Sequence, residues 1–384
     1  MTYNVEFLAA GEPSRRIVRD GVTVTTYGPR RRATYLRTLL RTYLHLRFAR
    51  FDILHCAELE SLIIAVIVSR LSAQRPLIVY DAHEYFPSLM TNYFKLPTPL
   101  SAALESLLDV VERIFASFCD AFIVVNDDLA ERFSAYRKPL AVVRNLPSLS
   151  WVDNTRTIDV LEDVDSPVVI ALAIHRTHGL LEILQAHSIL NKAGTRVCFV
   201  LAGRVKESDG RILRMASRQG VRVAGWIEND LLPNFLRRAS IGLALYSPAE
   251  ASSKAQFFSP TSEPSKVYTY MSAGLPIVAT DLPAIRALVS RENCGVLVPV
   301  GDADEIAYAI SRLLNDEKAR TSMGKRGRQA AEREYNWEIE SKRLLSLYDR
   351  IERELIGRTP GNRIRRRNTG RPRRTEQSER GGKE

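Results

Sequence analysis

The sequence predicts an α/β protein with two domains, each a parallel sheet covered by helices. Short apolar runs typical of buried strands alternate with helical patterns along most of the 384 residues, and such alternation favours doubly wound, Rossmann-like domains. A chain of this length exceeds one ordinary hydrophobic core. Its content of 45% apolar and 26% charged residues is that of a globular protein.

The first half is predicted to form a strand–helix series that ends near residue 150. Strands are expected at 5–9, 22–27, 51–56, 76–84, 121–126 and 141–147, and helices at 30–50, 59–71, 102–118 and from 127 onward. About a dozen residues separate the first two strands, too few for the crossover helix that parallel neighbours need. Either these strands are not a standard parallel pair or a helix is missing.

The second half repeats the same rhythm. Strands are expected at 167–173, 196–203, 221–226, 241–246, 277–279 and 295–299, and helices at 180–192, 210–220, 231–239, 283–290 and 304–315. Residues 151–166 are polar and acidic and are interpreted as a linker. The predicted domains are therefore 1–150 and 167–336.

The stretch 264–280, PSKVYTYMSAGLPIVAT, indicates a helix, a sharp stop and a buried strand. Ser265 is a favourable N-cap, and Gly274 ends the helix. Helix N-termini beside strand ends favour phosphate, whereas Lys266 in the first turn opposes the helix dipole. Lys266 is therefore either a group that serves an anionic ligand or an ordinary surface lysine.

Polar residues also follow the predicted strand 76–84. Asp81, His83 and Glu84 come at its carboxyl end, where the sites of open α/β sheets are found. Because side chains alternate along a strand, Asp81 and His83 are expected on the same side.

Several site classes lack support. The sequence contains no GxGxxG, Walker lysine loop or GxSxG elbow after a strand. The two Asp-x-Asp patterns, 163–165 and 302–304, fall in the linker and at a helix start, and the four cysteines are scattered. We therefore expect no metal site, and we interpret the cysteines as reduced thiols of a cytoplasmic protein. No signal-peptide pattern is seen, and the longest apolar run, 62–68, is far below the roughly 20 residues of a membrane-spanning helix.

The net charge of +11 is concentrated in two segments. Residues 357–384 carry ten Lys and Arg against three Asp and Glu, which predicts a disordered basic tail. The helix at 30–50 holds seven Arg, with an apolar stripe of Leu36, Leu39, Leu40, Tyr43, Leu44 and Leu46, and with Arg37, Arg41 and His45 on another face. Both segments are candidates for contact with an anionic membrane. The alternatives are a solvated tail and an ordinary sheet-covering helix, and no specific nucleic-acid binding is predicted.

The chain resembles the family 4 glycosyltransferases of the GT-B fold. The resemblance covers about residues 3–350 and is carried by YDAHE (80–84), VVRNLP (142–147), LAGR (201–204) and PSKVYTYMSAGLPIVAT, and it ends with YNWE (335–338). It implies two Rossmann-like domains facing a cleft, and a closing helix at 337–356 that crosses back to the first domain. It also implies transfer of a sugar from a nucleotide-sugar to a glycan or lipid-linked acceptor, with retention and without a metal or other cofactor. The second domain would hold the donor and the first the acceptor.

The same resemblance assigns roles to residues. His83 matches the family's histidine near the donor sugar and is the expected catalytic residue. Lys266 and the amides of Ser265 and Val267 would lie near the diphosphate, and Gly203 and Arg204 near the nucleotide. Fixed cations and helix N-termini aimed at a leaving diphosphate suit this chemistry, because the leaving group gains charge in the transition state.

Three features depart from the family pattern. Its two glutamates would fall at Thr261 and Thr269, where Thr269 offers a neutral partner to the ribose and Glu263 is out of register by two. In the loop 173–179 His178 replaces the usual cation, and Arg176 is left to reach the phosphates. The family's first strand and helix have no counterpart, so we expect that the chain starts about 30 residues late.

Three functions remain in view: an active glycosyltransferase, a catalytically degenerate GT-B scaffold that binds a glycan or protein, and a nucleotide-sugar epimerase of the same fold. The first is favoured and predicts a cytoplasmic protein at the inner face of a membrane.

Overall fold

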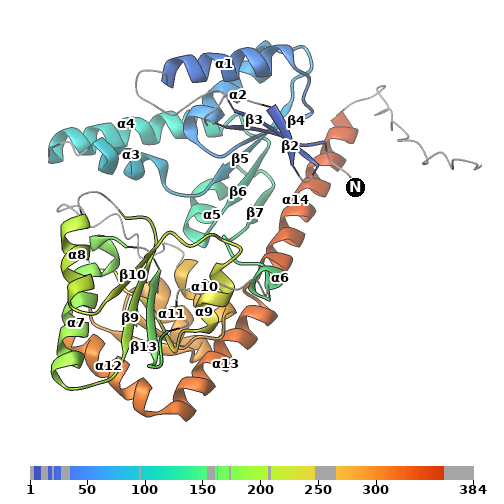
Figure 1. Cartoon of the computed structure of the whole chain (residues 1–384). Coiled ribbons are helices and arrows are strands. Elements are labelled where there is room, and N and C mark those ends of the chain that lie inside the picture. Colours follow the sequence, from blue (N-terminus) through green and yellow to red (C-terminus); the bar gives the residue numbers. More distant parts are fainter. Residues whose placement is uncertain are drawn as a thin grey trace, which may run out of the picture.

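The computed structural model shows two α/β domains, one above the other, with one long helix, α14 (Trp337–Arg358), running from the lower to the upper (Figure 1). The structure describes residues 4–9, 16–19, 21–26, 35–94, 97–153, 161, 163–172, 174–205, 209–246 and 265–358. Parallel sheets with helices on both faces confirm the predicted fold class.

The first domain opens with a three-stranded sheet, in the order β1 (Glu6–Ala9), β3 (Val22–Thr26), β2 (Arg16–Arg19). β1 and β3 are parallel neighbours, and β2 lies antiparallel to β3. The chain thus passes from β1 to β3 through the strand β2 and not through a crossover helix. This explains how two parallel neighbours can be so close in sequence. Gly21, with a φ of +80°, stands in the β2–β3 turn, where a side chain would be strained.

The rest of the first domain is a four-stranded parallel sheet, β4 (Ile53–Cys56), β5 (Leu77–Ala82), β6 (Ala121–Val124) and β7 (Leu140–Val142), in that order. One face packs against α1 (Tyr35–Phe48), α2 (Leu59–Leu71), α4 (Thr98–Ala116) and α5 (Asp127–Ser134), and α3 (Phe86–Phe94) packs against α4. The other face is covered by α14, whose Leu347 and Ile351 contact Val79 and Ile123.

The second domain is one six-stranded parallel sheet in the order β10-β9-β8-β11-β12-β13. The strands are β8 (Val168–Leu172), β9 (Cys198–Ala202), β10 (Arg222–Gly225), β11 (Ile241–Ala244), β12 (Ile277–Thr280) and β13 (Gly295–Val298). Because the chain winds outward from β8 to β10 and then returns to β11, the strand order switches between β8 and β11. Ligands of doubly wound folds bind at such a switch point.

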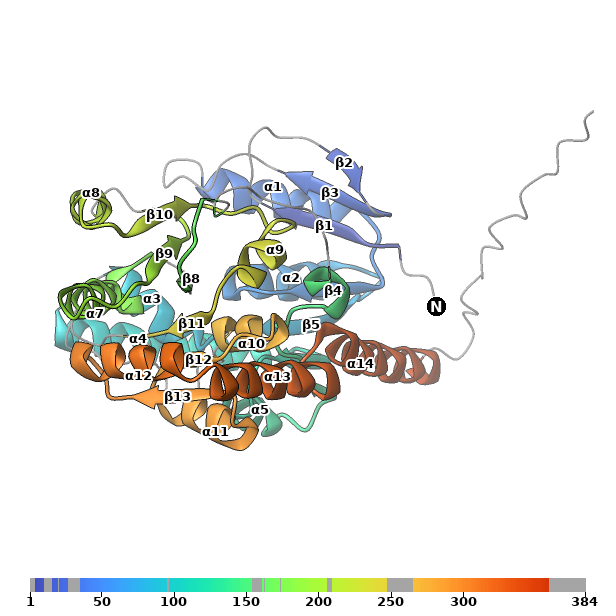
Figure 2. The same cartoon turned by 60° about the horizontal axis from the view of Figure 1, so that its bottom comes forward.

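Helices cover both faces of this sheet. α7 (Leu180–Lys192), α8 (Gly210–Arg218) and α12 (Ala303–Asn315) share one apolar core. α9 (Leu232–Arg237), α10 (Ser265–Ser272), α11 (Pro283–Glu292) and α13 (Glu317–Arg333) share the other. Figure 2 shows α12 and α13 one after the other along one edge of the domain.

Two segments of the chain cross between the domains, and hydrogen bonds join them. The first, 143–153, contains the short helix α6 (Leu149–Val152), and the second is the start of α14. The Trp337 amide donates to the Pro147 carbonyl at 3.1 Å. The carboxylate of Glu340, 1% exposed, accepts from the Arg144 amide at 3.1 Å. The start of α14 is therefore fixed to the interdomain crossing.

Candidate functional site

The switch point in the second domain gathers three chain segments. The turn 174–179 follows β8 and contains a short 3-10 helix, η2 (Arg176–His178), before α7 begins. Leu245 and Tyr246 follow β11, and α10 starts beside them at Ser265. Two helix N-termini, those of α7 and α10, therefore open near the ends of adjacent strands, and their first amides lack partners within the helix.

Lys266 is the cation of this site. Its ammonium lies 4.5 Å from the centroid of the Tyr246 ring, and the edge of His178 packs against the same ring at 5.4 Å. Burial lowers the pKa of Lys266 to about 7 and raises the pKa of Tyr246 to about 12. A desolvated cation in the first turn of a helix is unfavourable by itself, so the arrangement favours an anionic ligand.

Gly179 brings the turn close to β11. It is the N-cap of α7, with a φ of +72°, and a Cβ there would stand 2.7 Å from the Cβ of Leu245. A larger residue would push the α7 N-terminus away from Tyr246 and Lys266. The requirement for glycine at this position is therefore both conformational and steric.

Arg176, which was expected to reach the phosphates, has an acidic partner within the second domain. Its Nε lies 3.4 Å from Oδ1 of Asp209, which is buried at the start of α8. The ion pair ties η2 to α8. Arg176 could turn toward another anion only by weakening this contact.

Gly203 and Arg204 lie at the end of β9. Gly203 has a φ of +147°, and its amide donates to the carbonyl of Gly225 at 2.7 Å. The Arg204 guanidinium stacks on the ring of Trp226 at 4.8 Å. Trp226 follows β10 and is largely exposed, so the pair forms a flat surface at the carboxyl edge of the sheet.

The remaining predicted donor residues belong to α10 or precede it. Ser265 was predicted as the N-cap, but the helix begins at Ser265 itself. The Val267 side chain is fully buried, which leaves its backbone for a ligand. The Thr269 hydroxyl donates to the Ser265 carbonyl at 2.9 Å within the helix. Glu263 lies outside the described residues, as does Thr261.

On the first domain, His83 lies at the domain boundary. Its Nδ1 is 3.5 Å from the amide nitrogen of Asn145, in the crossing segment, and the next residue, Leu146, packs in the core of the second domain. His83 Nε2 lies 3.4 Å from Asp81 Oδ2. The hydrogen bond to Asp81 raises the pKa of His83 above its ordinary value. The predicted pairing of Asp81 and His83 on one side is confirmed.

The sequence analysis did not identify two residues that lie beside Asp81 and His83. His55 Nε2 lies 2.8 Å from Asp81 Oδ2, and His55 Nδ1 lies 2.6 Å from the hydroxyl of Tyr348 on α14. Alternation along 51–56 could have placed His55 on the face of the sheet that Asp81 occupies. Tyr348 carried no signal, because α14 is distant in sequence.

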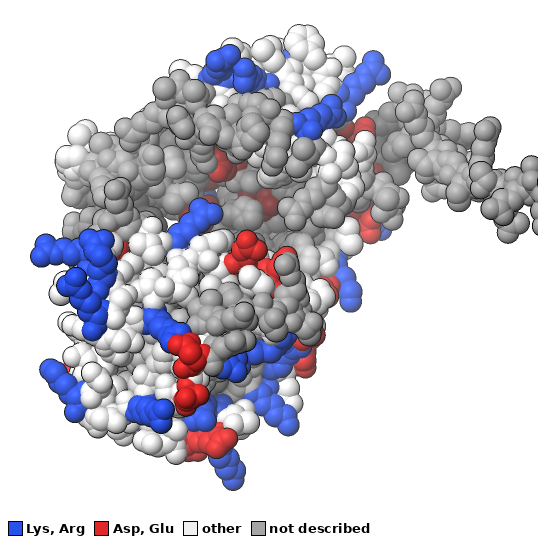
Figure 3. Space-filling model, viewed as in Figure 1, with Lys and Arg blue, Asp and Glu red and all other residues white. Residues whose placement is uncertain are grey.

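Positive charge gathers on one flank of the second domain. Figure 3 shows Lys and Arg side chains gathered over α8, where Arg211, Arg214 and Arg218 are exposed. These arginines add positive potential on the second domain, which steers anionic ligands. Among the residues that the structure describes, no three His, Cys, Asp or Glu side chains are grouped to hold a metal ion.

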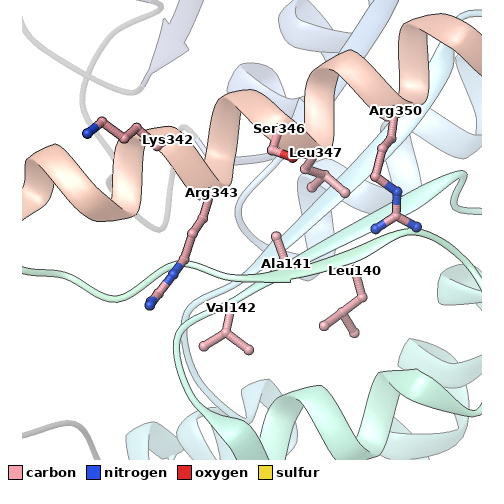
Figure 4. A pocket seen from close by; sticks show the side chains of 8 residues that line it. All are labelled: Leu140, Ala141, Val142, Lys342, Arg343, Ser346, Leu347 and Arg350. Carbon is pink, nitrogen blue, oxygen red and sulfur yellow. The ribbon is translucent and has the colours of Figure 1, made fainter. Parts of the chain in front are cut away.

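A separate groove of about 410 Å³ lies between β7 and α14 (Figure 4). It is lined by Leu140, Ala141, Val142, Lys342, Arg343, Ser346, Leu347 and Arg350. It includes none of the predicted site residues.

Two doubly wound domains joined by two crossings have the architecture of the GT-B fold. Solved structures of this class match nearly the whole chain. Sucrose-phosphate synthase from Thermosynechococcus elongatus matches with a TM-score of 0.67 and 17% identity over 93% of this chain and 90% of that chain. Anabaena HepE in complex with UDP-glucose matches with a TM-score of 0.59 and 14% identity over 87% and 86% of the two chains.

Sequence comparisons point to the family. The model "Glycosyltransferase Family 4" matches residues 2–146, and the model "Glycosyl transferases group 1" matches residues 166–316. The chain therefore belongs to the family 4 glycosyltransferases. It is 35% identical over 81 residues to the phosphatidyl-myo-inositol mannosyltransferase of Mycolicibacterium smegmatis, a match that spans 21% of this chain and 21% of that relative. A capsular polysaccharide glycosyltransferase of Staphylococcus aureus is 30% identical over 22% of each chain.

Among the described residues, no helix is both long enough and apolar enough to cross a bilayer.

Proposed function

We propose that the protein transfers a sugar from a nucleoside-diphosphate sugar to a hydroxyl of a lipid-linked or glycan acceptor. The observation that carries the proposal is the position of Lys266, a desolvated ammonium in the first turn of α10 at the strand-order switch point. In the reaction the bond between the anomeric carbon and the diphosphate breaks, and the acceptor oxygen bonds to that carbon. The hydroxyl proton leaves with the nucleoside diphosphate or to water.

The proposed chemistry is mainly electrostatic. The diphosphate gains negative charge as the glycosidic bond breaks, and the Lys266 ammonium with the α10 and α7 amides stands where this charge develops. Because the cluster is desolvated, a charge interaction there is worth more than in water. In this proposal Lys266 supplies the charge stabilisation that a metal provides in other transferases, and the stereochemistry is retention.

His83 is proposed to contact the donor sugar from the first domain. It lies beside the crossing segment, so both domains must be in place for it to face the donor. Its contact with the reacting sugar would orient the anomeric carbon toward the acceptor.

The acceptor side is proposed to rest on an anionic membrane. α1 carries four exposed apolar side chains on one face, Leu36, Leu40, Leu44 and Phe48, which are 78%, 56%, 42% and 81% exposed. The exposed Arg37 and Arg47 stand among them. The predicted single stripe of α1 is in fact divided, because Leu39, Tyr43 and Leu46 pack into the domain core. The sheet-covering and the membrane-facing interpretations of this helix thus apply to adjacent faces.

The neighbouring helices extend this surface. α2 packs between α1 and α4. The exposed apolar residues of α2 and α4 are Ile67, Leu71, Leu100, Leu107, Val110 and Ile114, and the exposed Phe118 follows α4. Arg70 lies over the Phe118 ring at 4.5 Å. Apolar side chains would enter the interface while arginines contact acidic headgroups, each worth about 1 kcal/mol. The protein would then work at the cytoplasmic face of a membrane; the tail 357–384 is outside the described residues apart from the end of α14.

A catalytically degenerate scaffold is the second candidate, and two observations favour it. Thr269 bonds within its own helix where the family has an acid, and Arg176 is paired with Asp209. Such a protein would keep the two domains and the membrane face but would bind no nucleotide-sugar.

Thermal-shift titration with UDP- and GDP-sugars tests the two candidates. A donor present at 100 times its Kd should stabilise the native state by about 2.7 kcal/mol, whereas a degenerate scaffold should show no shift. Release of free nucleoside diphosphate, dependent on an added lipid or glycan acceptor, then establishes transfer. No stabilisation by any nucleotide-sugar would refute the transferase proposal.

A further inference from the structure

Two hydrogen bonds and one ion-pair contact link the closing helix to His83. The Tyr348 hydroxyl lies 2.6 Å from His55 Nδ1, His55 Nε2 lies 2.8 Å from Asp81 Oδ2, and the same oxygen is 3.4 Å from His83 Nε2. We call these four residues the imidazole relay. It joins β4, the end of β5 and α14 on one face of the first sheet.

The chemistry of the groups fixes where the protons lie. Burial alone would raise the pKa of Asp81, but the hydrogen bonds from His55 and His83 outweigh it and lower this pKa to about 2. Asp81 is therefore a carboxylate, which only accepts hydrogen bonds. Both imidazoles must carry a proton on Nε2. In neutral His55 the Nδ1 lone pair then accepts from the Tyr348 hydroxyl.

We propose that His55 and Tyr348 are positioning residues for His83: they hold the Asp81 carboxylate so that His83 turns Nε2 inward and leaves Nδ1 for the ligand. In the structure His83 Nδ1 lies 3.5 Å from the side-chain amide nitrogen of Asn145 in the interdomain crossing, a long contact that a ligand at Nδ1 would replace. This inference rests on the proposed function, since the ligand at His83 is the donor sugar.

The inference gives α14 a second role. The helix starts clamped to the crossing segment by Trp337 and Glu340. Further along, Leu347 is buried against the first sheet, and Tyr348 beside it reaches His55. The last helix that the structure describes thus completes the surroundings of a histidine that is more than 260 positions earlier. A sequence motif around His83 cannot contain this information.

The competing explanation is that Tyr348 and His55 only dock α14 on the sheet. The two explanations differ in what happens at His83. If the contact is only structural, its loss lowers stability but leaves the His83 ring as it was. If it positions Asp81, the tautomers and the pKa of His83 change even where stability does not.

Nitrogen-detected NMR titration of the full chain labelled at histidine distinguishes them, because six histidines give few signals. In the wild type, His55 should show the Nε2–H tautomer. Tyr348→Phe should convert it to a mixture of tautomers. Asp81→Asn should lower the pKa of His83 because the carboxylate charge is lost. His55→Ala should raise the pKa of His83, because the Asp81 carboxylate then no longer shares its negative charge with a second donor and stabilises protonated His83 more strongly.

Kinetics provide the second readout. His55→Ala should lower kcat about tenfold to a hundredfold with little change in donor KM, as expected when a reacting group is misplaced. His55→Gln should recover part of kcat, since its amide can still donate to Asp81. Tyr308→Phe on α12, a tyrosine far from the relay and largely exposed, is the matched control for Tyr348→Phe and should leave both readouts unchanged.

The outcomes separate the two proposals. Unchanged His83 titration in His55→Ala and Tyr348→Phe overturns the positioning role, whatever the activity. The predicted NMR changes in a protein that transfers no sugar would support the relay and count against the transferase.

Discussion

The ammonium of Lys266 lies 4.5 Å from the centre of the Tyr246 ring, in the first turn of α10. Apart from that ring, the surroundings disfavour a cation: the helix dipole opposes it and burial lowers its pKa to about 7. A folded protein keeps such a group where a ligand compensates for it. Stability and function should therefore respond to Lys266 in opposite directions.

Lys266→Met tests this opposition, because methionine keeps the apolar stem and removes the charge. We expect the unliganded variant to gain roughly 1 kcal/mol in free energy of unfolding, since an opposed charge at a helix N-terminus is removed. We expect turnover to fall by about 10²–10³-fold, as when one preorganised donor is lost from a transition state. Urea unfolding and steady-state kinetics measure the two. A variant that is less stable yet equally active would remove Lys266 from the site.

The pKa of Lys266 also predicts a pH dependence of donor binding. The pKa of Lys266 is lowered from its ordinary value to about 7, so the side chain is partly unprotonated near neutrality in the free protein. A bound diphosphate favours the charged form and draws a proton from solution, so affinity should fall as pH rises above about 7. Calorimetry of UDP binding in two buffers of different ionisation enthalpy should show proton uptake at pH 7.5. Lys266→Met should abolish the uptake.

Gly179 should be needed for this site as well as for the fold. In Gly179→Ala the new Cβ would stand 2.7 Å from Leu245 Cβ at a φ of +72°, and we expect about 2–3 kcal/mol of destabilisation with weaker nucleotide binding. Gly194→Ala is the control, because its φ is +71° with no atom within 4 Å of the added carbon. It should cost about 1 kcal/mol. Equal losses in the two variants would show that steric contact at Leu245 is unimportant.

A buried ion-pair network supports the segment that carries His83. Arg132 donates to Glu112 and to Asp109, both at 2.6 Å, and Asp109 accepts from the Tyr85 hydroxyl at 3.0 Å. Because Glu112 is buried, Arg132→Met should cost about 3–5 kcal/mol in free energy of unfolding. Arg113→Met removes an exposed partner of the same Asp109 and should cost less than about 1 kcal/mol. Chemical denaturation of both variants measures the difference, and similar costs would mean that Glu112 is solvated.

The sequence predicted most strands and the two-domain plan, because buried parallel strands are apolar runs of a recognisable length. It missed β2, whose four residues, RIVR, include two arginines. It also missed α13, which has no apolar stripe. That helix packs through Gly324, Gly327, Ala330 and Ala331, and a Cβ on Gly324 would stand 2.1 Å from the Gly274 carbonyl oxygen. Small residues that permit close packing leave no hydrophobic period to detect.

Site residues could be predicted where they lie within one short stretch of the sequence. Lys266 and the Asp81–His83 pair each lie within a short stretch with its own strand or helix signal. The role of Arg176 was not predictable, because its partner Asp209 lies on another helix. Tyr348 and His55 meet only through the tertiary fold. Local patterns therefore identify the residues at strand ends, and the contacts that orient them require the structure.

The exposed face of α1 yields the last prediction. Leu40 and Leu44 are half-exposed on the face of the helix next to the one that carries Leu39 and Tyr43, which pack into the domain core. A double substitution, Leu40→Glu with Leu44→Glu, should leave the melting temperature nearly unchanged because the core face is intact. It should abolish flotation with vesicles that contain acidic phospholipid, since it removes apolar area and adds two like charges.

Arg37→Ser with Arg47→Ser should weaken binding mainly at low salt, where headgroup attraction is least screened. Tyr308→Glu, an exposed aromatic on α12 of the other domain, controls for general surface charge and should float like the wild type. If the double α1 variant floats as well as the wild type, this helix is not the membrane contact, and the exposed residues of α2 and α4 become the segments to substitute.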